Sequence, residues 1–376
     1  MMMALIWKTL NTNMNNNYVA IMAGGVGSRF WPSSRISKPK QFLDIMGVGK
    51  SLLRLTFERF LNVCPAEHIY IVTNLDYIDL VKEQLPELGA HQILAEPSRN
   101  NTAPCVAYTA LKLHALNPKA NFVVAPSDHI ILNEPKFVAE IQKALAFTAQ
   151  NDALLTLGIT PSRPDTGYGY IRFQDNIGFH NHDETIHKVV QFTEKPPYEK
   201  ALEYVKSGEY VWNAGIFVWS TKSILKSFKA NAPEILDILD DGKKVFNTDA
   251  EQAFINEAYP RTPNISIDYA IMERADNVFT IPTEFGWSDL GTWGSLHAEA
   301  PKDERGNAIN ASLALIAETS NCLIKASDKK LVVINGLDDF IVVDEDDVLM
   351  IYPKSKEQEI KQVTAEVARA IGVQYL

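Results

Sequence analysis

Through its first 150 residues the chain alternates short apolar runs with longer amphipathic stretches. The stretches carry apolar residues at helical spacing, and many begin at a polar residue or a proline. Such alternation predicts a parallel sheet with helices on both faces, in which ligands bind beyond the carboxyl ends of the strands. The predicted strands are 18–22, 69–73, 92–95 and 122–125, and the predicted helices are 51–61, 77–85, 103–116 and 134–149.

The pattern changes twice further along the chain. Between 153 and 261 strand-like and helix-like segments are mixed, and after about residue 300 short β-rich runs follow one another until a predicted final helix at 357–371. No internal repeat stands out. We therefore predict three parts: an N-terminal extension that is disordered or mis-assigned (1–15), an α/β domain with a Rossmann-like mixed, mostly parallel sheet (16–299), and a small β-rich domain (300–376).

The charge balance excludes several classes of partner. The chain has 36 Lys and Arg against 46 Asp and Glu, a net charge of −10, so we expect no binding to nucleic acid or to an anionic membrane. No apolar run approaches the length of a membrane span. Three widely spaced cysteines form no CxxC pair, which indicates neither a zinc site nor a disulfide framework and favours a cytoplasmic protein.

The loop after the first predicted strand is glycine-rich and locally basic. Its sequence from residue 24 is GGVGSR, and the segment up to Lys40 contains no acidic residue. Glycines let backbone N–H groups approach a phosphate, so this loop is a candidate anion site in an acidic chain. A dinucleotide fingerprint would need a third glycine where Phe30 stands, which argues against NAD. The cations of the segment are Arg29, Arg35, Lys38 and Lys40.

A second glycine motif, at 47–51, has the end of a P-loop. The first glycine of that motif would fall on Asp44, and the preceding residues make a weak strand. We interpret the segment as a surface turn that leads into a helix capped by Ser51.

Residues 24–42, GGVGSRFWPSSRISKPKQF, resemble the signature of the sugar-1-phosphate nucleotidyltransferase family, and the WPSSR–KPKQF form is similar to that of its mannose-1-phosphate guanylyltransferases. The resemblance extends from residue 18 to about 355. Long members of the family carry a C-terminal isomerase domain, and we expect this chain to be a short form without it. The further matching segments, in the family's order, are 96–97 with 101–104, 126–129, 166–170, 192–196, 212–215, 266–269 and 287–291.

The resemblance implies transfer of GMP from GTP to mannose 1-phosphate, giving GDP-mannose and pyrophosphate, with Mg²⁺ as cofactor. It also implies a β-helix-like C-terminal domain and a homodimer. Two alternatives remain open: the same fold acting on another nucleoside triphosphate or hexose 1-phosphate, and a non-catalytic nucleotide-sugar sensor.

The resemblance also implies a role for individual residues. Glu96 suits guanine, because a carboxylate can accept hydrogen bonds from both N1–H and the 2-amino group. The implied catalytic cations are Arg29, Lys40 and Lys195, and the implied metal ligands are Asp128 and Asp289. The implied nucleotide-binding residues are Gly24, Gly25, Gly27, Ser28, Glu96, Asn101 and Thr102, and the implied sugar-binding residues are Gly167, Tyr168, Glu194 and Asn213.

Simpler interpretations of the same residues stay open at this point. Asp128 could be a turn or capping residue, and Glu194 with Lys195 could be a solvated strand end. The segment 266–268 resembles a helix start and is left without a role. The family has Arg-Asn-Thr-Ala-Pro where this chain has Asn100 between Arg99 and Asn101, so the use of Arg99 is open.

Overall fold

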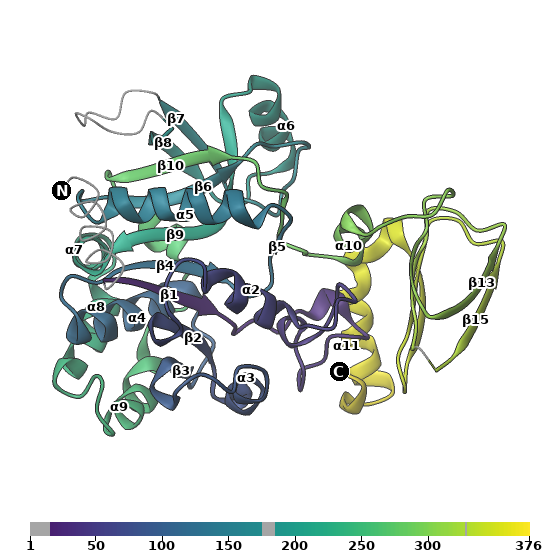
Figure 1. The fold of residues 1–376 in the computed structure, drawn as a ribbon, viewed down its shortest axis with the longest axis horizontal. Coiled ribbons are helices and arrows are strands. Elements are labelled where there is room, and N and C mark those ends of the chain that lie inside the picture. Colours follow the sequence, from purple (N-terminus) through teal and green to yellow (C-terminus); the bar gives the residue numbers. More distant parts are fainter. Residues whose placement is uncertain (1–15, 175–184, 328) are drawn as a thin grey trace, which may run out of the picture. The chain divides into compact units, whose positions relative to one another are not determined.

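A computed structural model describes residues 16–174, 185–327 and 329–376 of the chain (Figure 1). The prediction for residues 1–15 therefore lies outside the described residues. The chain forms two compact units, and neither is continuous in sequence. The first unit comprises 1–24, 57–127 and 131–287, and the second comprises 25–56, 128–130 and 288–376. The predicted division at residue 299 stays a prediction.

The described part of the first unit contains a nine-stranded sheet in the order β3-β2-β1-β4-β9-β6-β10-β8-β7. Strand β1 pairs in parallel with β2 and β4, and β2 pairs in parallel with β3, as strand–helix alternation predicts. β10 is parallel to β6, whereas β9 runs antiparallel to β4 and β6. The predicted α/β fold with a mixed sheet is confirmed. The strands are β1 Asn17–Met22, β2 Ile69–Asn74, β3 Ile93–Glu96, β4 Asn121–Pro126, β6 Leu154–Ile159, β7 Tyr170–Gln174, β8 His187–Thr193, β9 Tyr210–Ser220 and β10 Val278–Thr283.

Helices α4, α7 and α8 pack together on one face of this sheet. Alternate residues of β4, Phe122 and Val124, point into their common apolar cluster, as strand geometry requires. Helix α5 packs against β4, β6 and β9 and is visible along these strands in Figure 1. The helices of this unit are α3 Ile78–Gln84, α4 Thr102–Leu116, α5 Glu134–Thr148, α6 Tyr198–Ser207, α7 Thr221–Asn231, α8 Pro233–Asp240 and α9 Glu251–Ala258.

The second unit contains a small β-helix. Its strands contribute alternately to two sheets, one with the order β12-β14-β16-β17 and one formed by β13 and β15. β14 pairs in parallel with β16, and β13 with β15, each at an offset of 18 residues, so one turn stacks on the next. Cys322, Ile324 and Val342 fill its interior. The predicted β-helix-like domain is thereby confirmed. The strands are β12 Ala308–Asn310, β13 Leu313–Ala317, β14 Leu323–Lys325, β15 Leu331–Asn335, β16 Phe340–Asp344 and β17 Leu349–Pro353.

A second apolar cluster joins the β-helix to the segment that follows the glycine-rich loop. Leu323 and Ile341 of the β-helix share this cluster with Phe30 and with Trp293 and Ile360 of two helices, α10 (Trp293–Glu299) and α11 (Ile360–Ala370). The loop and the C-terminal strands therefore belong to one packed body. The chain passes between the two units after residues 24 and 127, and within α2 (Leu52–Phe60), β5 (Ile130–Ile131) and β11 (Trp287–Ser288).

The turn at 47–51 is confirmed as a surface feature. The amides of Val48 and Gly49 donate to the carboxylate of Asp44 at 3.0 and 2.6 Å, and Ser51 Oγ accepts from the Arg54 amide at 3.1 Å at the start of α2. Asp44, which stands where a P-loop would have its first glycine, therefore closes the turn with its side chain. Across the described ranges, no helix combines the length and the apolar character that crossing a membrane requires.

Candidate active site

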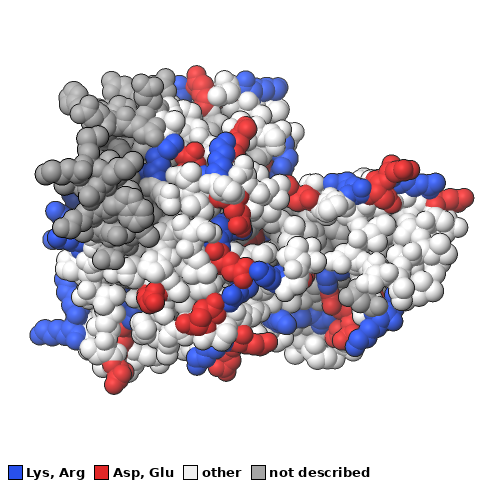
Figure 2. All heavy atoms as spheres, in the orientation of Figure 1, with Lys and Arg blue, Asp and Glu red and all other residues white. Residues whose placement is uncertain are grey.

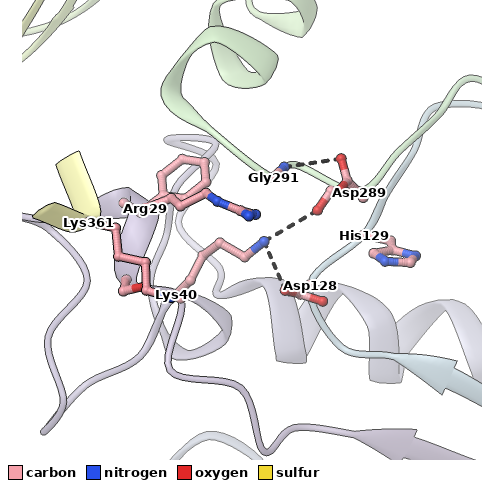
Figure 3. Close-up of a pocket in the computed structure, with 10 residues that line it drawn as sticks. Arg29, Lys40, Asp128, His129, Asp289, Gly291 and Lys361 are labelled. Carbon is pink, nitrogen blue, oxygen red and sulfur yellow. Dashed lines mark hydrogen bonds and ion pairs between the residues drawn. The ribbon is translucent and has the colours of Figure 1, made fainter. Parts of the chain in front are cut away.

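A basic pocket of about 290 Å³ lies within the second unit, next to the glycine-rich loop (Figure 3). Ligand pockets usually measure about 300–1,000 Å³, so this one lies at the small end of that range. The pocket brings together four of the residues predicted from sequence as catalytic or metal-binding. It is lined by Gly27, Ser28, Arg29, Phe30, Lys40, Asp128, His129, Asp289, Gly291 and Lys361.

Lys40 is the buried centre of this pocket. Its Nζ lies 2.8 Å from Asp128 Oδ2 and donates to the Leu290 carbonyl at 2.8 Å and to the Asp289 carbonyl at 3.3 Å. A Cβ on Gly27 would lie 2.6 Å from Lys40 Cβ, and Gly27 has φ +59°, so this position requires glycine. The loop is thus built so that its backbone passes directly over the lysine.

Asp128 and Asp289 both face the pocket with their carboxylates. Burial alone would raise the pKa of Asp128, but the charges of Lys40 and His129 hold this pKa below its ordinary value. The Asp289 carboxylate accepts a hydrogen bond from the Gly291 amide at 3.1 Å. In the part of the chain that the structure describes, no group of three or more potential ligand side chains could hold a metal.

Arg29 and Lys361 add two further cations to the lining of the pocket. Arg29 belongs to the predicted loop, whereas Lys361 lies on α11 and was not anticipated from the sequence. In Figure 3 Lys361 lies at one end of the pocket and His129 at the other, with Lys40 between them. A lone lysine on an amphipathic helix carries no local signal, so only the packing of α11 reveals it.

Glu96, at the end of β3, belongs to a second group of predicted residues, within the first unit. Its carboxylate accepts a hydrogen bond from the Tyr259 hydroxyl and also contacts the Cys105 thiol. Burial raises the pKa of Glu96 to about 7, against the opposing effect of these two hydrogen bonds. A Cβ on Gly24 would lie 3.4 Å from Glu96 Oε2, so the first loop glycine passes beside this carboxylate. Tyr259 and Cys105 were missed by sequence reasoning.

The side chains of Asn101 and Thr102 make hydrogen bonds within the protein at the start of α4. Asn101 has φ +67°, and its side chain caps α4 by accepting from the Thr102 amide at 2.9 Å. The Thr102 hydroxyl accepts from the Ile267 amide at 2.8 Å. Arg99 donates to the Tyr77 hydroxyl at 3.0 Å and lies 3.7 Å from Asp76. Nucleotide contacts by Asn101 and Thr102 remain predictions.

A third group gathers the predicted sugar-binding residues around Glu194 and Asn213. The Asn213 amide donates to the Gly169 carbonyl at 2.8 Å, and Glu194 Oε1 pairs with Lys195 Nζ at 2.8 Å. Glu194 Oε2 is buried and has no hydrogen-bond partner within the described residues. It faces Gly169, where a Cβ would approach to 2.5 Å, so a larger residue would displace the carboxylate.

Asp268, left without a role above, belongs to the same group. Its Oδ1 accepts from Asn213 Nδ2 at 2.9 Å. Burial and the charge of Glu194 raise the pKa of Asp268 to about 7, while Lys195 and Asn213 act in the opposite direction. Two neighbouring carboxyl groups thus lie close to one lysine, and the Asn213 amide donates to one of them, an arrangement that suits hydrogen bonding to hydroxyl groups.

Gly167 and Tyr168 lie in the loop before β7. The Gly167 amide donates to Asp165 Oδ1 at 2.9 Å, which closes the loop. The Tyr168 ring packs edge-on against Trp212 and Trp287, with centroid distances of 5.0 and 5.2 Å. These contacts fix the loop beside β9, the strand that carries Asn213.

Comparison with known proteins identifies the families that the two parts of the chain match. Residues 18–306 match the family model described as nucleotidyl transferase, and residues 314–367 match one described as a MannoseP isomerase/GMP-like β-helix domain. The chain is 35% identical over 355 residues to mannose-1-phosphate guanylyltransferase of Escherichia coli (strain K12), covering 93% of this chain and 73% of that protein.

Two other proteins are similar over a comparable share of the chain. The alginate biosynthesis protein AlgA of Pseudomonas syringae pv. tomato is 37% identical over 352 residues, which cover 92% of this chain and 70% of that protein. A crystal structure described as mannose-1-phosphate geranyltransferase from Thermus thermophilus superposes with a TM-score of 0.82 at 28% identity. That match covers 94% of this chain and 99% of the other.

Proposed function

Because the chain belongs to the nucleotidyl transferase family, we propose that it transfers GMP from GTP to mannose 1-phosphate, releasing pyrophosphate. The E. coli relative at 35% identity bears the name of this activity. The observation that carries the proposal is the basic pocket, in which Arg29 and Lys40 of the glycine-rich loop line one cavity with the carboxylates of Asp128 and Asp289. A sensor would need to bind phosphates but would not need paired carboxylates beside them.

The reaction needs charge neutralisation and positioning more than proton transfer. A phosphate oxygen of mannose 1-phosphate, ionised at neutral pH, attacks the α-phosphorus of GTP. The bond from that phosphorus to the oxygen bridging to the β-phosphate breaks, and pyrophosphate leaves with the electron pair. The pocket cations stabilise the charge that develops on the phosphates, which is the main catalytic contribution in phosphoryl transfer.

Recognition of the base and the sugar belongs to the first unit in this proposal. Glu96 reads the two donors on the edge of guanine, and Gly24 leaves room beside it. Glu194 accepts hydrogen bonds from the sugar hydroxyls, and Lys195, whose ammonium is half-exposed, neutralises the sugar phosphate. The buried, unpartnered Oε2 of Glu194 supports this role, since a buried acceptor is costly unless a ligand satisfies it.

We further propose that Asp128 and Asp289 hold Mg²⁺. The donor set fits this ion, because Mg²⁺ commonly takes one or two carboxylates and completes its octahedron with phosphate oxygens and water. The lowered pKa of Asp128 keeps that ligand ionised at neutral pH. When bound, the ion would add positive charge next to the reacting phosphates. Lys40, paired with Asp128, orients one of these carboxylates.

Pyrophosphate release is the direct test of the proposed function. The protein is incubated with each of the four common nucleoside triphosphates and with several hexose 1-phosphates, and pyrophosphate is measured. We expect release from GTP only when mannose 1-phosphate is present.

Arg29→Ala should reduce turnover by about two orders of magnitude, since removing one preorganised charge costs about that much. Release with a different pair of substrates would assign another activity, and wild-type turnover in Arg29→Ala would remove that residue from the site.

The metal proposal has its own test. Asp128→Asn and Asp289→Asn should each lower activity strongly and raise the Mg²⁺ concentration needed for half-maximal rate, because an amide is a weaker ligand for a hard cation. Thermal unfolding without metal should change little in Asp289→Asn, whose carboxylate is at the pocket surface. Full activity in excess chelator would contradict a metal at this site.

Finally, we propose that the protein is a cytoplasmic homodimer joined through the face of β13 and β15. Four large aliphatic side chains on this face are 52–67% exposed: Leu313, Leu315, Leu331 and Val333. They are paired across the two strands, Leu313 beside Leu331 and Leu315 beside Val333. Figure 2 shows an extensive uncharged surface over these strands. An uncharged patch can meet its own copy across a two-fold axis without charge repulsion, even in a chain of net charge −10.

A further inference from the structure

The cations of the basic pocket differ in how far they are already engaged. Lys40 is paired with Asp128 and donates to two carbonyl groups. Arg29 and Lys361, by contrast, have no ion-pair or hydrogen-bond partner anywhere in the described ranges, yet both line the cavity. Their charges are thus available to an anionic ligand, and one of them comes from outside the glycine-rich loop.

The structure fixes Lys361 at the pocket through its neighbour in the sequence. Ile360 is completely buried in the cluster that contains Phe30 and Trp31, the residues directly after Arg29. Val363 and Val367 of α11 pack against the same cluster. Lys361 itself is exposed, so the burial of Ile360 determines where the helix holds the lysine.

A second set of contacts ties the end of the chain to the loop. The Tyr375 carbonyl accepts hydrogen bonds from Trp31 Nε1 and from Arg35 Nη1, both at 2.7 Å. The loop segment therefore contacts both the first turn of α11 and the segment that follows the helix.

We propose that Lys361 is a further catalytic residue, which binds the β- and γ-phosphates of the nucleoside triphosphate and the pyrophosphate formed from them. This inference rests on the proposed function. The carboxylates that suit the metal lie towards the His129 end of the pocket, and Lys361 lies at the opposite end (Figure 3). A phosphate chain extended across the cavity from the carboxylates reaches Lys361 with its terminal groups. Charge accumulates on those groups as the bond to the α-phosphorus breaks, so an ammonium there favours departure of pyrophosphate.

The test compares two cations of the same helix. Lys361→Ala removes the lysine at the pocket, and Arg369→Ala removes an exposed cation of α11 that does not line it. Binding of inorganic pyrophosphate, with Mg²⁺ in the buffer, is measured by calorimetric titration, which needs no turnover. We expect Lys361→Ala to raise the dissociation constant about 10- to 100-fold, as for loss of a charged hydrogen bond, and Arg369→Ala to leave it unchanged. Lys361→Arg should restore most of the affinity.

Turnover supplies the second measurement. Lys361→Ala should lower kcat for GTP and leave the KM for mannose 1-phosphate unchanged, whereas Arg369→Ala should change neither. Equal pyrophosphate affinity in the wild type and in Lys361→Ala would overturn the inference, and so would an equal loss in both alanine variants. If Lys361→Ala does not fold, Lys361→Met, which keeps the aliphatic stem, takes its place. A wild-type chain that binds pyrophosphate through Lys361 but releases none from GTP would refute the proposed function and the catalytic role, and would leave only the pyrophosphate site at Lys361.

Discussion

The surroundings of Glu96 shift the ionisation of its carboxyl group. Its carboxyl group is held by Tyr259 and Cys105, and burial raises its pKa to about 7. Only the ionised form can accept hydrogen bonds from both donors of guanine, because a protonated carboxyl group turns one oxygen into a donor. If Glu96 binds guanine as proposed, the residue is divided near neutral pH between a form that can accept from both donors and one that cannot.

Base selection should accordingly depend on pH. The preference for GTP over ATP, measured as the ratio of kcat/KM values, should increase as pH rises from about 6 to about 8, because ionisation of Glu96 occurs in this window. Glu96→Gln should abolish this pH dependence and weaken discrimination by about 1–3 kcal/mol, since the amide NH₂ faces the donors of guanine. A wild-type preference for GTP that does not change with pH would contradict a role of Glu96 in base recognition. The same pH dependence in Glu96→Gln as in the wild type would contradict it too.

Residues that follow strands could be found from sequence, and residues that act from helices could not. Arg29, Lys40, Asp128 and Asp289 were all predicted, and the structure places all four around one pocket. Asp128 and Asp289 lie in loops, and Arg29 and Lys40 lie in single helical turns within a glycine- and proline-rich segment, where charged residues stand out. Asp268 and Lys361 lie in helical segments, where a charged residue is ordinarily a solvated one. Only tertiary packing distinguishes a helical charged residue that lines a site from one that is merely solvated.

At the scale of elements, long periodic segments were predicted well and short strands less well. Helices α4 and α5 were anticipated to within a residue at each end, because each carries several turns of apolar spacing. β12 has only three residues and was missed. The apolar runs after residue 300 predicted a β-rich module, but their parallel stacking came from the family resemblance alone.

The pairing pattern of the β-helix explains why its parallel stacking could not be predicted from the apolar runs. Pairing at an offset of 18 residues joins Leu331–Asn335 with Leu313–Ala317, two apolar segments in which only the first and fourth residues are identical. Short apolar runs of this kind occur in many kinds of sheet, so the runs alone do not indicate stacking. Polar residues also recur at the same offset. Asn321 donates to Asp339 at 2.8 Å and Ser320 to Asp338 at 2.5 Å, each pair joining equivalent corners of successive turns.

At the scale of the whole molecule, the compact units cut across the order of the chain. Residues 25–56 and 128–130 pack with the C-terminal strands rather than with the sheet that precedes them in sequence. Changes of composition along a chain can only suggest continuous domains, so they could not predict units that are discontinuous in sequence. One consequence is that the segment that lines the basic pocket and the β-helix share an apolar cluster, so the proposed dimer face belongs to the body that holds the pocket.

The proposed dimer can be tested on the face of β13 and β15. Leu315→Glu combined with Leu331→Glu should convert a dimer into a monomer, because two carboxylates per subunit would face their own copies across the interface. Leu116→Glu, at a 49% exposed leucine of the other unit, is the matched control and should remain dimeric. Mass is measured by sedimentation velocity at micromolar concentration. Since all three positions are exposed, thermal unfolding should change by little more than the loss of the interface. A wild-type chain that sediments as a monomer would remove the dimer, and a double variant that stays dimeric would move the interface elsewhere.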